Sequence, residues 1–207
     1  MSKFTLIAGP CAIEDDTMPF IIGREVKRIC DALDINFIFK GSYRKANRSR
    51  LDSFTGIGDE LALGILQSVG KELGVQTITD IHESHEADLV AKYVDNIQIP
   101  AFLCRQTELL LAAGRTGKGV NIKKGQFLSP EAMLFPLEKV RSTGNEKVWL
   151  TERGNSFGYT DLIVDATAIT RLKALGAFTI MDCTHAVQKP NKTEGVTAIT
   201  PAGGNCY

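Results

Sequence analysis

The stretch NFIFKGSYRKANRS, residues 36–49, decides the fold, because an apolar run leads directly into cations and hydrogen-bonding side chains. Six other stretches repeat this pattern, each with an apolar run that ends in a cation, amide, thiol or imidazole. They are TLIAGPC (5–11), VQTITDIHE (75–83), NIQIPAFLCR (96–105), GVNIKKGQF (119–127), KVWLTERG (147–154) and AFTIMDCTHAVQ (177–188). The apolar runs are short and bounded by polar residues, so the sequence predicts seven strands with chemically active carboxyl ends.

Helical patterns lie between these strands, because apolar residues recur there at intervals of three and four. They cover residues 19–33, 59–73, 84–94, 106–117, 130–144 and 165–175. Alternation of strand and helix predicts a parallel sheet. In a barrel of such units the carboxyl ends of the strands build the active site. We therefore expect an α/β fold of the TIM (β/α)8 barrel type, with about seven βα units in this chain.

The chain length bears on how much of a barrel is present. A barrel of eight units normally takes about 250 residues, whereas this chain has 207. Residues 191–207 are rich in Gly, Pro and Thr and have no helical period, so we expect a loop-like, divergent tail there. We predict a single barrel domain over residues 1–207 that lacks its eighth unit at the C-terminal end.

Composition excludes several classes of protein. The chain is 43% hydrophobic with a formal net charge of zero, so it can bury a core but has no overall field to attract nucleic acid or anionic lipid. No apolar run reaches the ~18 residues of a membrane span, and the N-terminus lacks the pattern of a signal peptide. The five cysteines are scattered and odd in number, which is typical of reduced thiols. We expect a cytoplasmic protein with no nucleic-acid or membrane partner.

The densest chemistry follows the second predicted strand. Five cations, interleaved with hydroxyl and amide donors, are Lys40, Arg44, Lys45, Arg48 and Arg50. Such a set suits a phosphate or carboxylate ligand, because charge-assisted hydrogen bonds to anionic oxygens are strong. A solvated basic loop is the alternative, but the position after a buried type of strand favours an anion site.

Other strand ends supply further candidates. Lys123 rather than Lys124 should face the barrel mouth, because side chains alternate along a strand. By the same alternation Asp80 and His82 fall together. Arg105 and Arg153 each follow a strand directly, where an anionic substrate would explain both and capping or surface ion pairs are the alternative. Lys45, Lys123 and Arg153 could together hold an enol phosphate without a metal to neutralise its charge.

Buried and metal-type side chains complete the set. Gln98 lies in the middle of IQIPAF, where an unpaired amide would be costly, so it needs a partner. Cys11 ends the first strand and His185 ends the seventh, so both could face one mouth. Thiolate and imidazole suit a divalent transition metal, although complete sites use three or four protein ligands. A free thiol and a hydrogen-bonded structural histidine are the alternative.

Several strings strongly resemble the 3-deoxy-D-manno-octulosonate 8-phosphate synthases. They are IAGPCAIE, FKGSYRKANRS, DIHES, IQIPAFLCRQT, NIKKGQF, LTERGNSFGYTDLIVD and DCTHAVQ, and the resemblance runs from about residue 4 to residue 190. It implies a barrel enzyme, usually a homotetramer, that condenses phosphoenolpyruvate with D-arabinose 5-phosphate and releases phosphate in the synthesis of a lipopolysaccharide precursor. No organic cofactor is implied.

The resemblance also assigns roles to residues. Lys45, Lys123 and Arg153 match positions that contact phosphoenolpyruvate, and Lys40, Ser42 and Gln98 match supporting positions. The triplet Asn47, Arg48 and Ser49 matches the cradle for arabinose 5-phosphate, to which Arg105 is supplied from a neighbouring subunit. The implied chemistry is attack of C3 of phosphoenolpyruvate on the sugar aldehyde, addition of water at C2, and loss of phosphate by C–O cleavage.

The resemblance extends to the metal-dependent form of these synthases, which carries cysteine in the first-strand motif. It implies that Cys11 and His185 are ligands of a divalent ion such as Zn, Fe or Mn, and that Lys45, His185 and Cys11 act in catalysis. Two further ligands of the family, a glutamate and an aspartate, have no counterpart in this chain.

The chain departs from the family pattern at two places, and two other functions are alternatives. Many members read SFDKANRS, whereas this chain reads SYRKANRS and so carries Arg44 in place of an acid. The stretch after GVT also differs. A 3-deoxy-D-arabino-heptulosonate 7-phosphate synthase-like enzyme is one alternative, although KANRS replaces its typical K-P-R-T string. The other is a non-catalytic truncated barrel that retains phosphoenolpyruvate binding.

Overall fold

The computed structural model describes residues 3–189 and 198–199. The chain forms two compact units, which cover Met1–Gln98 and Ile99–Tyr207. Within both units, strands and helices alternate along the chain. None of the helices in the described residues combines the length and the apolar character that crossing a bilayer requires.

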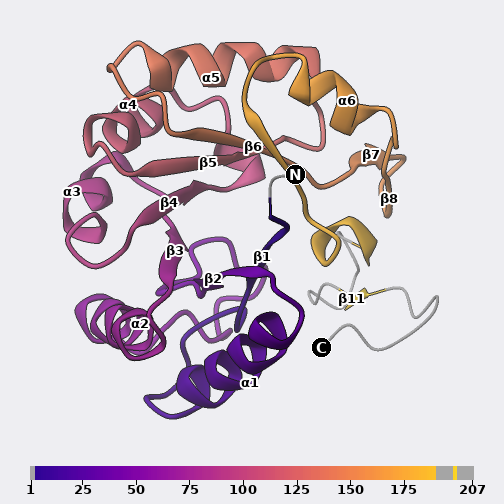
Figure 1. Ribbon diagram of the computed structural model, residues 1–207. Coiled ribbons are helices and arrows are strands. Elements are labelled where there is room, and N and C mark those ends of the chain that lie inside the picture. Colours follow the sequence, from indigo (N-terminus) through magenta and orange to yellow (C-terminus); the bar gives the residue numbers. More distant parts are fainter. Residues whose placement is uncertain (1–2, 190–197, 200–207) are drawn as a thin grey trace. The chain divides into compact units, whose positions relative to one another are not determined.

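The first unit carries a parallel sheet in which β1, β2, β3 and β4 follow each other in sequence order. Its elements are β1 (Thr5–Ala8), α1 (Met18–Ala32), β2 (Asn36–Lys40), α2 (Asp59–Leu73), β3 (Gln76–Asp80), the 3₁₀ turn η1 (Ser84–Glu86), α3 (Ala87–Val90) and β4 (Asn96–Ile99), whose last residue crosses the unit boundary. Figure 1 shows α1 and α2 beside the strands of this unit. The register pairs Asp80 at the end of β3 with Gln98 at the end of β4, so polar residues gather at one edge.

Local sequence explains where these elements begin and end. Asp15 accepts hydrogen bonds from the backbone N–H groups of Thr17 (2.7 Å) and Met18 (2.6 Å) at the start of α1. Backbone N–H groups at a helix start have no acceptor within the helix, so the side chain of Asp15 supplies one. Gly74 ends α2 in the left-handed conformation that glycine adopts without strain. At the end of β1, a Cβ on Gly9 would lie 2.0 Å from the carbonyl oxygen of Lys40. The glycine of the IAGPC string therefore lets the ends of β1 and β2 approach closely.

The second unit carries a parallel sheet of β5, β6 and β9. Its elements are η2 (Ala101–Leu103), α4 (Thr107–Arg115), β5 (Gly119–Lys123), η3 (Glu131–Met133), α5 (Leu134–Arg141), β6 (Val148–Glu152), β7 (Asn155–Phe157), β8 (Asp161–Ile163), α6 (Ala168–Lys173), β9 (Phe178–Met181), η4 (His185–Val187), β10 (Gln188–Lys189) and β11 (Ala198–Ile199). The pairs β7–β8 and β10–β11 are short and antiparallel. Figure 1 shows α4, α5 and α6 along the outside of β5 and β6.

The core of each unit is made by the strands and the inner faces of the helices. All residues of β4 and β5 are buried, as is typical of parallel strands covered by helices. From the helices, Leu63, Leu66 and Val69 of α2 and Leu110 of α4 are fully buried. Hydrophobic burial therefore fixes the strands, and the functional side chains follow at their carboxyl ends.

The seven predicted strands are confirmed, and the fold is an α/β fold of the TIM-barrel type with about seven βα units. The helix predicted over residues 84–94 is shorter, because η1 occupies its first turn and α3 has four residues. The β7–β8 hairpin was not predicted. Residues 191–197 and 200–207 of the predicted tail lie outside the described residues, and the single domain over residues 1–207 stays a prediction.

Candidate functional site

The loop after β2 places two lysines beside buried polar groups of the first unit. The ammonium of Lys45 donates a hydrogen bond to the hydroxyl of Ser42 at 2.7 Å, and Ser42 is fully buried. The backbone N–H of Lys45 donates to the carbonyl of Thr55 at 2.8 Å. Lys40 ends β2 and is half-buried. Three residues predicted to bind phosphoenolpyruvate in this unit, Lys40, Ser42 and Lys45, therefore lie in one stretch of chain. Hydrogen bonds to Ser42 and Thr55 fix the side chain and the backbone of Lys45.

The end of β3 brings a carboxylate to these lysines. Nε2 of His82 lies 3.5 Å from Oδ2 of Asp80, so the two residues that alternation predicted to fall together do so. Burial opposes ionisation of Asp80, yet the hydrogen bond with His82 and the positive charges of Lys40 and Lys45 prevail and lower its pKa. The Oδ1 atom of Asp80 has no hydrogen-bond partner among the described residues. This edge of the first unit therefore combines charge with unsatisfied polar atoms.

Gln98 is buried, whereas the three residues predicted to bind arabinose 5-phosphate are exposed. Gln98 is buried and lies opposite Asp80 in the β3–β4 register. The triplet Asn47, Arg48 and Ser49 is exposed on the loop after β2. Nε of Arg48 donates to the carbonyl of Phe54 at 3.0 Å, which fastens the triplet to its own loop.

In the second unit, Lys123, Asp182 and His185 form one cluster. The ammonium of Lys123, at the end of β5, makes an ion pair with the Asp182 carboxylate and lies 3.3 Å from Nδ1 of His185. Asp182 also contacts the imidazole Nδ1 of His185 at 2.8 Å and accepts the backbone N–H of His185 at 3.0 Å. Burial opposes ionisation of Asp182, but His185 and Lys123 prevail and lower its pKa. Sequence reasoning missed Asp182, although it follows β9 directly and precedes His185 by three positions.

Arg153, after β6, is the most unusual cation of the second unit. Its side chain is 5% exposed, and Nη2 donates to the side chain of Gln188 at 3.2 Å. The Nε and Nη1 groups have no hydrogen-bond partner among the described residues. Burial lowers the pKa of Arg153, and the charges of Asp182 and Glu152 oppose that change. Because an arginine stays protonated in proteins, this guanidinium presents buried, unsatisfied donors that an anion would satisfy.

The buried ion pair of Lys124 and Glu152 lies next to Arg153 in the chain. Nζ of Lys124, which is fully buried, lies 3.5 Å from Oε1 of Glu152 and also contacts Asn155. Burial lowers the pKa of Lys124, and the charge of Glu152 opposes this. The same Glu152 oxygen accepts the backbone N–H groups of Arg153 (3.0 Å) and Gly154 (2.6 Å). Lys124 and Lys123 therefore pair with different carboxylates. Glu152, which sequence reasoning missed, shapes the turn that carries Arg153.

The predicted residues Arg105 and Cys11 are both exposed. Arg105 is exposed, and its carbonyl accepts a hydrogen bond from the ammonium of Lys139 at 3.1 Å. Cys11 is an exposed free thiol in the first unit, and His185 belongs to the second. No group of three or more His, Cys, Asp and Glu residues in the described part of the chain could hold a metal ion. The described residues thus do not supply a complete metal site.

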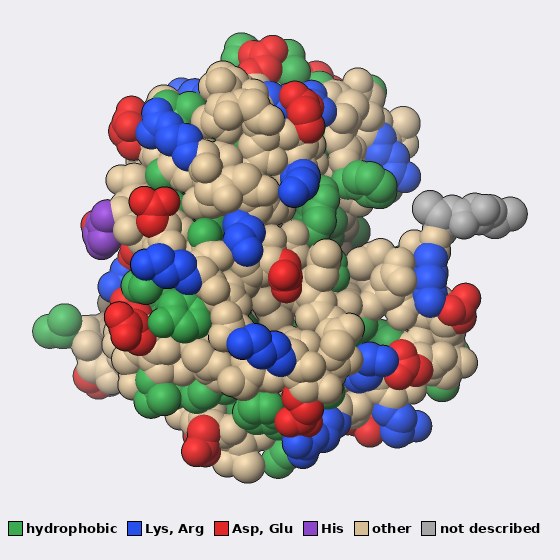
Figure 2. Space-filling model, turned by 60° about the vertical axis from the view of Figure 1, so that its left-hand side comes forward, with side chains coloured by type: hydrophobic (Ala, Val, Ile, Leu, Met, Phe, Trp, Pro, Cys, Tyr) green, Lys and Arg blue, Asp and Glu red, His purple; other side chains and the backbone are tan. Residues whose placement is uncertain are grey.

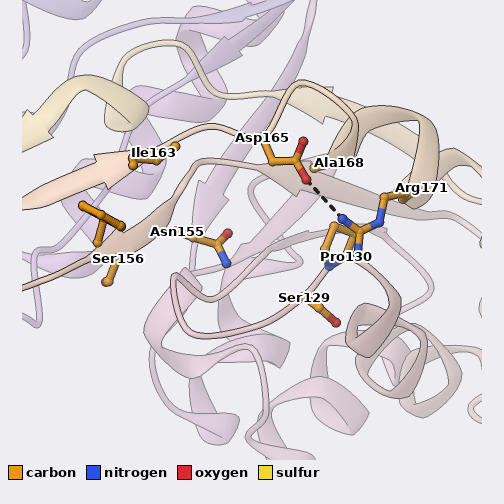
Figure 3. A pocket seen from close by; sticks show the side chains of 9 residues that line it. Ser129, Pro130, Asn155, Ser156, Ile163, Asp165, Ala168 and Arg171 are labelled. Carbon is orange, nitrogen blue, oxygen red and sulfur yellow. Dashed lines mark hydrogen bonds and ion pairs between the residues drawn. The ribbon is translucent and has the colours of Figure 1, made fainter.

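A hollow of about 280 Å³ lies in the second unit beside the β7–β8 hairpin. Figure 3 shows Arg171 reaching Asp165 at this hollow, at 3.1 Å. Arg171 also binds Glu131 at 2.5 Å and lowers the pKa of Glu131 to about 2. The cation of this hollow is therefore already neutralised, and none of the predicted substrate residues lines it.

The charged side chains on one face of the molecule are mixed in sign (Figure 2). Figure 2 shows basic and acidic side chains interspersed over the visible face. This mixture agrees with the formal net charge of zero.

The Asp182 cluster predicts a pH dependence of stability. A lowered carboxyl pKa adds stability above the unfolded-state value of about 3.9, and that stability is lost as the pH falls toward the folded-state pKa. We expect Asp182→Asn to lower the free energy of unfolding at pH 7 by about 2 kcal/mol. The difference from the unsubstituted chain should shrink below about pH 4. Urea unfolding at several pH values measures this.

The exposed Asp52, which pairs with Arg50, provides the control for Asp182. Asp52→Asn should change the free energy of unfolding little at any pH, because exposed pairs contribute little. A loss in Asp182→Asn that stays constant down to pH 3 would contradict the role of the carboxylate charge.

Comparison with known proteins agrees with this arrangement. The model of the DAHP synthetase I family matches residues 2–203. A 2-dehydro-3-deoxyphosphooctonate aldolase of Cyanothece sp. is 49% identical over 187 residues, which are 90% of this chain and 68% of the relative. The aldolase of a Synechococcus sp. is 48% identical over 90% of this chain and 66% of its own length. That of Bartonella henselae is 49% identical over 91% and 68%.

The chain therefore spans about two thirds of the length of these curated relatives. 2-Dehydro-3-deoxyphosphooctonate aldolase is another name for the synthase that the sequence strings resemble. The matched family, the identities near one half and the parallel βα order agree with one another. The chain belongs to the DAHP synthetase I family, among relatives that are 2-dehydro-3-deoxyphosphooctonate aldolases.

Proposed function

We propose that this chain condenses phosphoenolpyruvate with D-arabinose 5-phosphate and water to give 3-deoxy-D-manno-octulosonate 8-phosphate and inorganic phosphate. The observation that carries the proposal is the buried guanidinium of Arg153 with its two unsatisfied donors. Buried donors without partners are rare, and a phosphate or carboxylate is the ligand that suits a guanidinium best. The names of the relatives supply the reaction class.

In this proposal, phosphoenolpyruvate is bound by residues at several strand ends. Lys45, Lys123 and Arg153 supply positive charge to its phosphate and carboxylate groups. Lys40, Ser42 and Gln98 supply supporting hydrogen bonds. Asp182 orients Lys123 through their ion pair before the substrate binds, which lowers the reorganisation that binding requires.

Arabinose 5-phosphate binds the exposed loop after β2 in this proposal, through Asn47, Arg48 and Ser49. The exposed Arg105 is supplied to the same sugar phosphate from a neighbouring copy of the chain. The active form is thus a homo-oligomer, a tetramer by resemblance, in the cytoplasm. Neither nucleic acid nor a membrane takes part.

The proposed chemistry forms one C–C bond and breaks one C–O bond. C3 of phosphoenolpyruvate attacks the aldehyde carbon of the sugar, the aldehyde oxygen takes a proton, and water adds at C2. Loss of phosphate from C2 then breaks the C–O bond and leaves the keto acid. Lys45 neutralises developing negative charge, and His185, whose Nδ1 is held by Asp182, is placed to hold or move a proton.

Metal binding is a separate part of the proposal. Cys11 and His185 would hold a divalent Zn, Fe or Mn ion, which would supply positive charge at the site. Cys11 is proposed as a catalytic residue on the resemblance alone. No organic cofactor takes part. Metal analysis of the dialysed protein, before and after a chelator, tests this part alone.

The proposal is tested by phosphate release from phosphoenolpyruvate with either arabinose 5-phosphate or erythrose 4-phosphate. We expect release with arabinose 5-phosphate and little with erythrose 4-phosphate. The reverse preference would favour the heptulosonate synthase, which the names of the relatives do not favour. Binding of phosphoenolpyruvate without turnover would instead show a non-catalytic barrel that retains its ligand.

A further inference from the structure

Arg44 is the residue at which this chain departs from the SFDKANRS pattern, and the structure supplies its partners. One guanidinium nitrogen makes an ion pair with Oε1 of Glu86. Another lies 3.5 Å from Oδ2 of Asp59, at the start of α2. The guanidinium also lies 5.9 Å from the centre of the ring of Tyr43, which is buried. The positive charge of Arg44 is therefore compensated locally.

Glu86 connects Arg44 to the loop after β3. Its side chain is 5% exposed, and Oε2 accepts the backbone N–H of His82 at 2.7 Å. Glu86 thus uses one oxygen to hold the β3 loop and the other to hold the β2 loop. A carboxylate buried to this degree needs a partner, because removal of one member of a buried pair leaves an uncompensated charge.

Arg44 lies next to Lys45 in the chain. The ion pairs that fix Arg44 therefore also restrain Lys45. The backbone of Lys45 is hydrogen-bonded to Thr55, and its ammonium is hydrogen-bonded to Ser42. An acidic residue at position 44 would face the Glu86 carboxylate and repel it. Arg44 and Glu86 therefore form a matched pair in this chain.

We propose that the Arg44–Glu86 pair is a positioning device that joins the loop after β2 to the loop after β3 and fixes the position of Lys45. Arg44 does not bind substrate in this proposal and acts through Lys45. The part that concerns phosphoenolpyruvate rests on the proposed function, whereas the restraint on the loop does not.

Hydrogen exchange of residues 44–55 tests the restraint without any substrate. Arg44→Asp places two carboxylates together, and exchange there should accelerate by about tenfold or more. Glu86→Gln removes the repulsion, so the double variant R44D/E86Q should recover much of the protection. Should Arg44→Asp not fold, Arg44→Gln removes the charge without adding repulsion and should accelerate exchange less strongly.

The matched control for Arg44 is Arg28, which forms an exposed ion pair with Glu25 on α1. Arg28→Asp should leave exchange in residues 44–55 unchanged. Equal exchange of residues 44–55 in Arg44→Gln and the unsubstituted chain would overturn the proposal. So would failure of Glu86→Gln to restore protection in the Arg44→Asp background.

Coupling between Arg44 and Lys45 tests whether the restraint acts through Lys45. Arg44→Gln should weaken phosphoenolpyruvate binding, measured by calorimetry, by about tenfold in the unsubstituted chain but by less than about twofold in a Lys45→Ala background. The same factor in both backgrounds would show a general structural effect and overturn the action through Lys45. If the unsubstituted chain binds no phosphoenolpyruvate, the proposed function fails, and hydrogen exchange alone decides on the restraint.

Discussion

Arg153→Ala is expected to lower kcat/KM for phosphoenolpyruvate by about a thousandfold, because it removes a buried cation with two unsatisfied donors. Nearly all of the side chain is inaccessible to water, so solvent cannot replace the lost donors. Phosphate release at several phosphoenolpyruvate concentrations measures the effect, and calorimetry separates loss of binding from loss of turnover.

Two variants control for the loss of charge itself. Arg153→Lys keeps a cation but not the planar fork of donors, so it should recover only part of the activity. Arg171→Ala removes an arginine whose charge Glu131 and Asp165 already neutralise, and it should leave kcat/KM nearly unchanged. Similar losses in Arg153→Ala and Arg171→Ala would contradict the assignment of the anion site.

Glu152→Gln is expected to lower the free energy of unfolding by about 3 kcal/mol, because it leaves the fully buried Lys124 without a negative partner. The amide oxygen of glutamine can still accept the backbone N–H groups of Arg153 and Gly154. The substitution therefore removes the charge and keeps most of the turn. Chemical denaturation at pH 7 measures the change.

The double variant Lys124→Met/Glu152→Gln tests the cause of this destabilisation. Methionine removes the buried charge and keeps an unbranched side chain, so stability should recover in part relative to Glu152→Gln. Lys71→Met, on the exposed end of α2, serves as the control for the lysine replacement. A double variant less stable than Glu152→Gln alone would contradict the explanation through an unpaired lysine.

The strand order could be predicted from the sequence because each parallel strand is a short apolar run with a polar end. The joint placement of Asp80 and His82 followed from simple alternation and is confirmed. The β7–β8 hairpin could not be found in this way, because its strands have only three residues each. Gly158 supplies the left-handed turn residue between them, and this glycine is a signal that the sequence offers.

The partners in the buried ion pairs could not be predicted from the sequence. Arg44 and Glu86 are 42 positions apart, and Lys123 meets Asp182 only because β5, β6 and β9 lie in one sheet. The role of Glu152 could not be predicted, because the sequence does not indicate whether a carboxylate at a strand end contacts solvent or a buried lysine. The functional roles carried over by resemblance, including the metal ligands Cys11 and His185, stay predictions.

The proposed reaction releases phosphate by breaking the C–O bond of phosphoenolpyruvate during condensation with arabinose 5-phosphate. The most direct measurement uses phosphoenolpyruvate with ¹⁸O in the bridging C–O–P position and determines the mass of the phosphate released. We predict that release requires arabinose 5-phosphate and that the phosphate keeps the label. Phosphate without the label would show P–O cleavage, as in simple hydrolysis, and would contradict the proposed reaction.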